Sequence, residues 1–311
     1  MDISFVIPCY SSEKTIEIVV DEIYQLMSKH KKNSYEIILV NDCSPDSVYE
    51  VICNLSYADS HIKCIDFAKN FGQHSALMAG YRAARGDVVI SVDDDGQIPV
   101  EQTFDLLNKL EDGHDVAYAS FENNTRGMFR GFGTKVNDVM ANILLQKPKE
   151  LQLTSFFAMK RFICDEIVKY DSPYPYIPGL VLRSTRKICN VSMPLRNRLY
   201  GKSGYSLKKL LSLWLNGFTA FSVKPLRMAT VLGFICAAIG FMVGFYTIIH
   251  KLIYPMTPAG YSSLMAVLLF VSGIIMIILG LIGEYIGRIY ICLNNSPQYV
   301  IRQTVNFDDE K

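Results

Sequence analysis

The sequence lacks the features of most proteins that bind nucleic acids or structural metal ions. Its formal net charge is +1 over 311 residues, so no general basic field exists to attract nucleic acid. Its eight cysteines are scattered and none forms a CxxC pair, which excludes the usual spacing of zinc ligands. We therefore expect free, buried thiols in a reducing compartment and no structural disulfide.

Two terminal and loop features are also missing. The first apolar run has no basic segment before it, so we expect no cleavable signal peptide. The turn after this run, residues 8–12, contains no GxGxxG pattern. A dinucleotide-binding Rossmann domain is therefore disfavoured.

Short apolar runs alternate with helical patterns over the first 121 residues. Repeated βα units of this length predict a mostly parallel α/β sheet that is covered on both faces. A further strand and helix are expected at residues 154–159 and 161–170. The expected strands of the first part are residues 3–7, 35–40, 62–67, 88–92 and 116–121, with helices at 16–27, 48–55, 75–85 and 101–110.

The fourth of these strands ends in three consecutive carboxylates, Asp93, Asp94 and Asp95. Ligands of open α/β sheets bind outside the carboxyl ends of the strands, and adjacent acids repel one another unless a cation lies among them. Asp93 and Asp95 therefore suit a hard divalent cation that in turn binds phosphate oxygens. The alternative is an acidic turn exposed to solvent.

Polar residues also follow the first two strands, namely Tyr10 and Glu13 after the first and Asp42 after the second. We expect them at the same edge of the sheet as the three aspartates. The carboxylate of Asp42 suits hydrogen bonds from a base or ribose. An Asx turn with residues 44–45 is the alternative interpretation.

Two basic stretches follow. Residues 123–149 carry Arg126, Arg130 and Lys135 among several glycines, which suits either a mobile lid or a surface helix. Residues 196–205 form a basic, glycine-containing loop that includes Arg198. Such a loop suits a diphosphate, an anionic lipid surface, or both.

The excess of apolar residues, with a mean hydropathy of +0.18, lies late in the chain. Residues 228–249 and 264–282 are each long and apolar enough to span a bilayer, and residues 206–222 form an amphipathic pattern that suits the interface. Basic residues flank the outer ends of this hairpin, so the positive-inside rule places both termini and the α/β domain in the cytoplasm. The predicted parts are residues 1–205 (catalytic domain), 206–227 (interface helices), 228–287 (two transmembrane helices) and 288–311 (cytoplasmic tail).

Several stretches together, in this order, resemble family 2 glycosyltransferases that load a sugar onto a polyprenyl phosphate. These are relatives of dolichyl-phosphate mannose synthase, including the GtrB and ArnC types. Each motif alone is weak, but their shared order is specific and extends through the hairpin. The matching stretches are residues 5–13, 40–44, 70–80, 85–87, 93–99, 200–205 and 281–290.

The resemblance implies a GT-A fold with a nucleotide-sugar donor, by default a UDP-sugar, and a homo-oligomer of tetrameric form at the plasma membrane. Asp93 and Asp95 stand where the family's DxD motif binds Mg²⁺ or Mn²⁺ and the sugar diphosphate, and Gln97 follows as in the family. Arg198 and Ser203 fall in the loop that contacts phosphates. The residues implied to line the nucleotide pocket are Pro8, Tyr10, Glu13, Asp42, Asp93 and Asp94.

One departure from the family pattern concerns catalysis. The family usually has a carboxylate before residues 159–161, where this chain has Ser155 in residues 154–157. A lipid monophosphate has a second pKa of about 6, so its attacking oxygen is substantially ionised without a base. We expect direct, inverting displacement, with Asp93, Asp95 and Arg198 as catalytic residues and Arg130 also steering phosphates.

Two other functions stay open. The acceptor is either a polyprenyl phosphate or another membrane lipid or polysaccharide, although a QxxRW stretch, typical of processive synthesis, is absent and the single tryptophan, Trp214, lies in the amphipathic segment. A membrane-anchored scaffold that binds nucleotide sugars without catalysis is the non-enzymatic alternative.

Overall fold

The computed structural model describes residues 2–30, 34–121, 148, 151–194, 196, 224–254, 260–294 and 296–307. Its contacts divide the chain into two compact units. The first comprises Met1–Ser206 with Asn295–Lys311, and the second comprises Leu207–Asn294. The first unit therefore includes residues from both sides of the second in the sequence.

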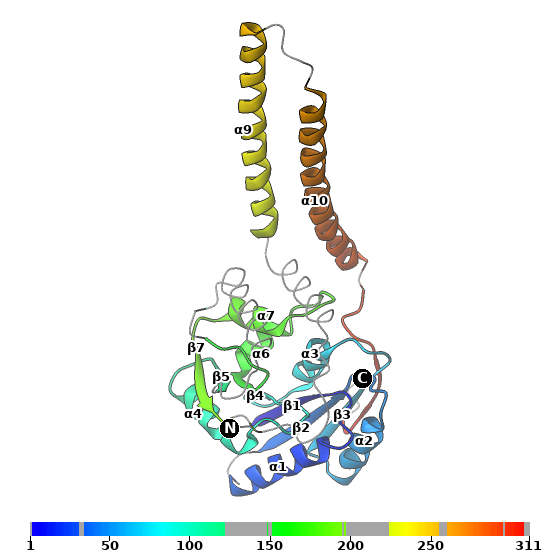
Figure 1. Cartoon of the computed structure of the whole chain (residues 1–311). Coiled ribbons are helices and arrows are strands. Elements are labelled where there is room, and N and C mark those ends of the chain that lie inside the picture. Colours follow the sequence, from blue (N-terminus) through cyan, green and yellow to red (C-terminus); the bar gives the residue numbers. More distant parts are fainter. Residues whose placement is uncertain are drawn as a thin grey trace. The chain divides into compact units, whose positions relative to one another are not determined.

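The first unit is built on an 8-stranded sheet with the strand order β7-β5-β6-β4-β1-β2-β3-β8 (Figure 1). Strands β4, β1, β2 and β3 are parallel, whereas β6 is antiparallel to β4 and β5, and β8 is antiparallel to β3. The predicted α/β class with a mostly parallel sheet is confirmed. The strands are β1 (Ile3–Cys9), β2 (Tyr35–Asn41), β3 (Ile62–Phe67), β4 (Val88–Ser91), β5 (Val116–Phe121), β6 (Phe157–Lys160), β7 (Ile188–Met193) and β8 (Ile301–Val305).

Helices cover both faces of this sheet. Figure 1 shows α1 and α2 on one side and α3, α6 and α7 on the other, as repeated right-handed βα connections require. The short 3₁₀ helix η1 leads from the β4 end into α4. The helices are α1 (Ile16–Lys29), α2 (Val48–Ala58), α3 (Gln73–Ala83), η1 (Val100–Gln102), α4 (Thr103–Glu111), α6 (Arg161–Ile167) and α7 (Ile177–Ser184).

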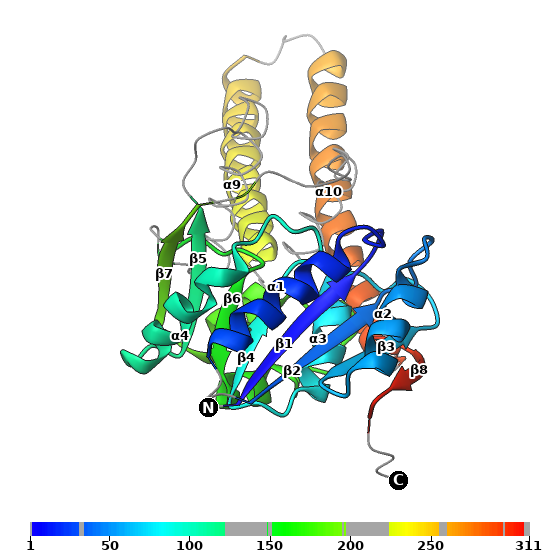
Figure 2. The ribbon, with the colours of Figure 1, turned by 90° about the horizontal axis from the view of Figure 1, so that it is seen from below.

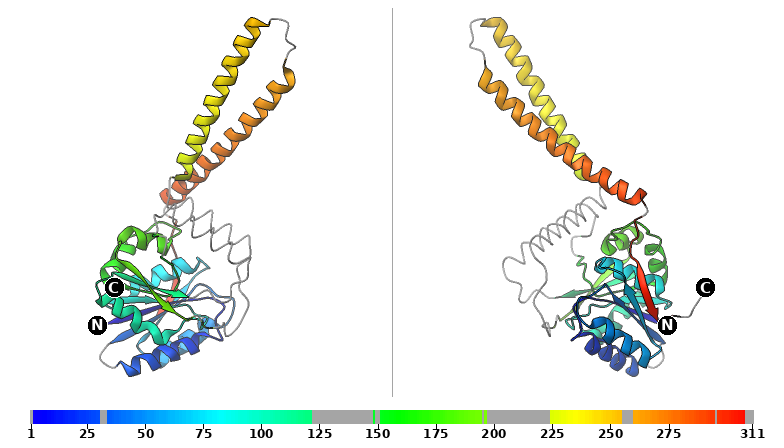
Figure 3. Two further views of the ribbon diagram at one scale, coloured as in Figure 1. Left: turned by 60° about the vertical axis from the view of Figure 1, so that its left-hand side comes forward. Right: turned by 90° about the vertical axis from the view of Figure 1, so that its right-hand side faces the viewer.

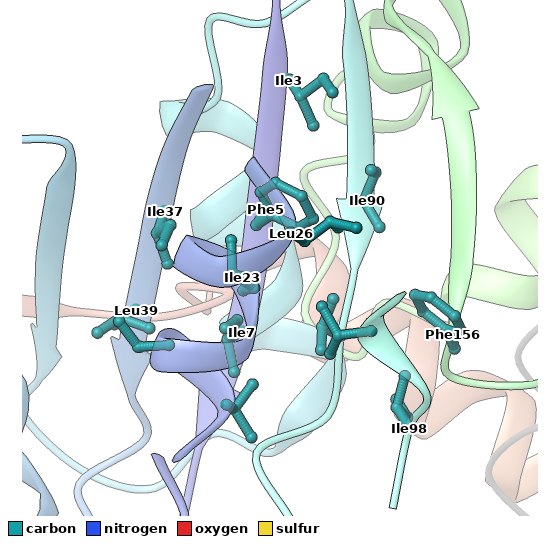
Figure 4. Close-up of a cluster of buried hydrophobic side chains, with 14 of the residues drawn as sticks. Ile3, Phe5, Ile7, Ile23, Leu26, Ile37, Leu39, Ile90, Ile98 and Phe156 are labelled. Atoms are coloured by element: carbon teal, nitrogen blue, oxygen red, sulfur yellow. The ribbon is translucent and has the colours of Figure 1, made fainter. Parts of the chain in front are cut away.

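The main core lies between the sheet and α1. Apolar residues at helical spacing give α1 one buried face, and Ile23 and Leu26 from this face pack over Phe5 of β1 (Figure 4). Each such buried side chain contributes roughly 1.5–3 kcal/mol to folding. The carboxyl ends of β1, β2 and β4 are thereby held on a rigid base. The other core residues that Figure 4 labels are Ile3, Ile7, Ile37, Leu39, Ile90, Ile98 and Phe156.

The structure adds elements that the sequence pattern did not predict. Helix α7 begins at Ile177, with Pro178 in its first turn, where the prolines indicated only a turn-rich connection. Proline is well tolerated in the first turn because that N–H has no helical partner in any case. Strand β7 is half-buried along most of its length, so it lacks a continuous apolar run.

The second unit contains α9 (Lys224–Ile253) and α10 (Tyr261–Leu293), which lie side by side (Figure 3). A Cβ at Gly233 of α9 would lie 3.7 Å from Cδ1 of Ile278 in α10. Within the described residues, one segment, Phe270–Leu293, is long and apolar enough to cross a membrane, and Gly233–Tyr246 is a shorter apolar segment. The amphipathic segment predicted at residues 206–222 lies outside the described residues.

The residues that follow α10 rejoin the sheet of the first unit. Strand β8 pairs with β3, with Val305 opposite Cys64 and Ile301 opposite Phe67 (Figure 2). Residues 288–311 were predicted as a cytoplasmic tail, and the structure has the end of α10 and an edge strand of the sheet within this range. The first unit is therefore completed by chain that follows the hairpin in the sequence.

Candidate active site

The loops that follow β1, β2 and β4 are joined at one edge of the sheet. The Tyr10 N–H donates to Oδ2 of Asp94 at 2.9 Å. The Glu13 N–H donates to Oδ2 of Asp46 at 3.0 Å, and the Ser47 N–H donates to Oε2 of Glu13 at 3.1 Å. The structure thus places Tyr10, Glu13 and Asp94 together, because the carboxyl ends of parallel strands share an edge.

Asp93, the first acid of the DxD motif, is held by two side chains from other elements. Nε2 of Gln73, the first residue of α3, donates to Oδ1 of Asp93 at 3.1 Å. The hydroxyl of Ser155, which precedes β6, donates to Oδ2 of the same carboxylate. Ser155 stands where the resemblance implies a carboxylate, and its hydroxyl orients Asp93.

Asp95 lies in a tight turn. The Gln97 N–H donates to Oδ1 of Asp95 at 3.1 Å, and Gly96 between them has a φ of 70°. That left-handed backbone favours glycine, because any other side chain would be strained there. Gly96 thus lets the chain turn out of the sheet directly after the acids.

Asp94, which lies between Asp93 and Asp95 in the sequence, connects the loop after β4 to the segment after β1. Its carboxylate accepts the Tyr10 N–H, and its carbonyl accepts the Thr15 hydroxyl at 2.6 Å. Desolvation by burial raises the pKa of Asp94 to about 6, against the opposing effect of hydrogen bonds from Ser12 and the Tyr10 N–H. The predicted nucleotide contact of Asp94 stays a prediction, and its observed contacts are to the loop after β1.

Asp42 is buried at the end of β2 and fastens the loop before α3. Its Oδ1 accepts the Phe71 N–H at 2.7 Å, and its Oδ2 accepts the Gly72 N–H at 2.8 Å. Burial raises the pKa of Asp42, although these two hydrogen bonds oppose the effect. The Asx-type contact belongs instead to Asn41, whose Oδ1 accepts the Ser44 N–H at 3.1 Å.

The remaining predicted nucleotide residues differ in exposure. Pro8 is buried within β1, opposite Val40 of β2. The side chain of Tyr10 is 50% exposed. The predicted phosphate and acceptor residues that lie outside the described residues are Arg130, Arg198 and Ser203.

Arg196 fastens the start of the basic loop to the DxD turn. Its N–H donates to the Gln97 carbonyl at 3.1 Å, and Nε2 of Gln97 donates back to the Arg196 carbonyl at 3.3 Å. The guanidinium pairs with Glu22 of α1 at 2.6 Å and with Glu101 of η1. Those pairs raise the pKa of Arg196, the bond to Glu101 most strongly. Arg196 is therefore held beside the turn that contains Asp95 and Gln97.

The donor chemistry at the DxD turn fits a hard cation. Asp93 and Asp95 supply oxygen ligands, and Mg²⁺ typically takes one or two carboxylates together with substrate phosphates and water. Among the described residues no group of three or more His, Cys, Asp or Glu side chains forms a metal cage. A divalent cation at Asp93 and Asp95 would complete its coordination with diphosphate oxygens and water.

Two residues of this site, Gln73 and Ser155, were not predicted as site residues, and Arg196 was predicted only as part of the basic loop of residues 196–205 that suits a diphosphate. Gln73 and Ser155 both hold Asp93, and Arg196 holds the Gln97 turn. Gln73 lies in a stretch that resembled the family, and Ser155 was noted only as a departure from the family pattern. Their contacts join positions far apart in the chain, so the sequence carried no direct signal of them.

Two family profiles match the chain. The profile described as glycosyl transferase family 2 matches residues 4–168. The profile described as the GtrB C-terminal hairpin matches residues 224–289. The two matches correspond to the sheet-based unit and to the α9–α10 hairpin.

Curated relatives match over nearly the whole chain. The uncharacterized glycosyltransferase YkcC of Bacillus subtilis is 34% identical, over 99% of this chain and 95% of its own length. The undecaprenyl-phosphate 4-deoxy-4-formamido-L-arabinose transferase of Proteus mirabilis is 32% identical, over 97% and 94%. The SfII prophage-derived bactoprenol glucosyl transferase of Shigella flexneri is 31% identical, over 98% of each chain.

Solved structures agree on the fold. Glucosyl-3-phosphoglycerate synthase from Mycobacterium tuberculosis, in complex with Mn²⁺ and UDP-glucose, superposes with a TM-score of 0.53 at 19% identity, over 70% of this chain and 77% of that one. At this identity the likeness concerns the fold alone, and it confirms the expected GT-A architecture. Since the family profile covers more than half of the chain and relatives above 30% identity cover nearly all of it, the protein belongs to the family 2 glycosyltransferases.

Proposed function

We propose that this enzyme transfers a sugar from a nucleotide diphosphate sugar to a polyprenyl phosphate, with inversion at the anomeric carbon. The observation that carries the proposal is the pair Asp93 and Asp95 at the carboxyl end of β4, beside the loop that follows β1 and the start of α3. The relatives named for undecaprenyl phosphate and bactoprenol support the choice of acceptor.

The donor diphosphate would be held by charge. Asp93 and Asp95 would bind Mg²⁺ or Mn²⁺, and such an ion, when bound, neutralises charge on the departing diphosphate. Arg198 and Arg130 would contact the same phosphates or that of the acceptor, since guanidinium groups bind phosphate in a bidentate manner. Ser203 would donate its hydroxyl to a phosphate oxygen.

The nucleotide would lie over the ends of β1 and β2, with UDP as the expected carrier. Tyr10 has the exposed ring that suits a nucleobase, and Glu13 lies beside it in the same loop. Asp42 and Pro8 would shape the floor of this site, because both are buried beneath the loops. Asp94 would hold the loop of Tyr10 in place.

Catalysis would need no protein base. The hydroxyl of Ser155 donates to Asp93, so it is engaged in orienting the DxD motif. The acceptor phosphate is substantially ionised near neutral pH, because its second pKa is about 6. The residues of the site would therefore act by holding the phosphate oxygen in line with the anomeric carbon.

The acceptor would be presented at a membrane. Residues 228–287 would form the membrane hairpin, residues 206–227 would lie in the interface, and the catalytic domain (residues 1–205), the segment 288–311 and both termini would face the cytoplasm. Basic residues on either side of the hairpin support this orientation. We further propose a homo-oligomer, a tetramer by family resemblance.

The test is transfer of radiolabelled sugar into the lipid phase with defined acceptors. Asp95→Ala should lower divalent-dependent transfer at least about 100-fold, whereas Asp105→Ala, at an exposed position of α4, should leave it unchanged. Full activity of Asp95→Ala, or a product with retained configuration, would contradict the mechanism. Transfer to diacylglycerol or a growing polysaccharide would identify a different acceptor, and binding without transfer would indicate a scaffold.

A further inference from the structure

A buried carboxylate at the end of β3 is paired by a residue that follows the hairpin in sequence. Asp66 is 1% exposed. Its Oδ2 lies 3.2 Å from Nη1 of Arg302 in β8, and its Oδ1 accepts Nδ2 of Asn41 in β2 at 2.7 Å. A buried carboxylate is costly unless it is paired and hydrogen-bonded, and Arg302 and Asn41 together supply these partners and fix the position of the Asp66 side chain.

The hydrogen bonds continue from Asn41 into two loops of the candidate site. The Asn41 amide donates to Asp66 through its NH₂ group, so its Oδ1 faces the other way and accepts the Ser44 N–H at 3.1 Å. The Ser44 hydroxyl in turn accepts the Ser11 N–H at 2.8 Å. A single chain of contacts thus leads from Arg302 to the loops after β2 and β1.

A second set of contacts holds the loop after β3. Nη2 of Arg302 donates to the Ala68 carbonyl at 3.1 Å, and the Ala68 N–H donates to the Val300 carbonyl at 2.9 Å. Further along the polypeptide lie Phe71 and Gly72, whose N–H groups donate to the Asp42 carboxylate. All three loops beneath the expected nucleotide are therefore connected to β8.

We propose that Arg302 is a positioning residue for the nucleotide, acting through Asp66 and Asn41 on the loops that contain Ser11 and Ser44. The inference rests on the proposed nucleotide-sugar donor and assigns a role to chain that follows the hairpin. Arg302 is assigned no contact with substrate, because its hydrogen bonds go to Asp66 and the Ala68 carbonyl. Its side chain is 54% exposed, so its replacement removes a partner of Asp66 without opening the core.

The test compares the full-length protein with Arg302→Met in detergent. Titration calorimetry with UDP and Mn²⁺ should give a dissociation constant raised about 5- to 10-fold, the loss expected for one hydrogen bond of ordinary net strength. The KM for the nucleotide sugar should rise by the same factor while kcat stays within about twofold. Arg302→Lys should recover part of the affinity, because it restores the positive charge.

Arg82→Met is the matched control. Nη1 of Arg82 also binds the segment after the hairpin, at the Tyr299 hydroxyl 2.9 Å away, and Arg82 pairs with Asp171 at 2.7 Å. In the part of the chain that the structure describes, the hydrogen bonds of Arg82 do not lead to Asn41, so this variant should bind UDP as the wild type does.

Two results would overturn the inference. The first is an unchanged dissociation constant and KM in Arg302→Met, and the second is a fall in kcat alone, which would indicate only a smaller folded fraction. Failure of the wild type to bind either UDP or GDP with Mn²⁺ would instead overturn the proposed function, and the inference with it. Nucleotide binding by the wild type therefore tests the proposed function, whereas the change in Arg302→Met tests the role of Arg302.

Discussion

The three consecutive aspartates after β4 have three different environments. Asp93 accepts bonds from the side chains of Gln73 and Ser155. Asp94 accepts a backbone N–H from the loop after β1 and is desolvated, whereas Asp95 accepts the N–H of its own turn. Asp93 and Asp95 therefore belong to the expected cation site, whereas Asp94 connects the loop after β4 to the loop after β1.

His74 gives the domain a predicted dependence of stability on pH. Its ring lies edge-on to Tyr176, with centroids 5.4 Å apart, and its Nδ1 is buried with no hydrogen-bond partner among the described residues. Desolvation lowers the pKa of His74 to about 4. The unfolded chain therefore binds this proton more readily, and the folded state loses stability as the pH falls from about 6.5 to about 4.

The measurement is urea unfolding at pH 7 and pH 5. The wild type should lose about 2 kcal/mol more between these values than His74→Gln, which has no proton to gain. Parallel losses in the two proteins would show that His74 does not carry the effect.

The sequence predicted which residues meet at the sheet edge better than it predicted what each one binds. Tyr10, Glu13 and the acids after β4 could be placed together, because strand ends follow from periodicity alone. The hydrogen-bond partners of Asp42 could not be predicted, because Phe71 and Gly72 reach it only through the β3–α3 connection of the folded chain. Hydrogen bonds between distant segments depend on tertiary structure.

At the scale of elements, α3 lies close to the sheet because of one glycine. A Cβ at Gly80 would lie 2.3 Å from Cγ1 of Val6 in β1 and 3.5 Å from Cγ2 of Val40 in β2. The first distance is below any normal contact, so α3 or Val6 would have to move. The position of Gln73 at the start of α3, and with it the bond to Asp93, depends on this close approach.

Gly80→Ala should therefore destabilise the domain by roughly 1–3 kcal/mol, the usual cost of overpacking, despite the better helix propensity of alanine. Denaturant unfolding measures the loss. The loss caused by Gly80→Ala should be smaller when it is measured in a Val6→Ala background, because the Cγ1 atom in conflict is then absent. Equal stability of Gly80→Ala and the wild type would show that α3 shifts at no cost.

Strands with continuous apolar runs could be predicted as elements, and edge strands could not. Strands β1 and β4 are buried along their whole length, and such runs are typical of a sheet covered on both faces. Strand β8 is exposed along most of its length, so its residues show no apolar pattern. Its identity as a strand comes from its partner β3.

At the scale of the whole molecule, the predicted topology can be tested by thiol labelling. Cys292 lies exposed near the end of α10, on the expected cytoplasmic side, and Thr257 lies in the expected external loop. Two variants are compared, one that keeps only Cys292 and one that has only the cysteine of Thr257→Cys. A membrane-impermeant maleimide should label Thr257→Cys in intact spheroplasts. It should label Cys292 only after lysis.

Labelling of Cys292 in intact spheroplasts would reverse the orientation. Labelling of both positions from one side would exclude a hairpin that spans the membrane. The first result would also separate the catalytic domain from a cytoplasmic supply of nucleotide sugar, because charged donors do not cross a bilayer unaided.

The late position of β8 in the chain also sets an order of assembly. A ribosome that has just finished β7 has made seven of the eight strands, and it must still synthesise α9 and α10 before Arg302 emerges. Asp66 therefore lacks its cationic partner until the apolar helices α9 and α10 have been synthesised. A nascent chain that stalls within the hairpin would therefore carry a sheet without its β8 edge strand and a buried Asp66 without Arg302.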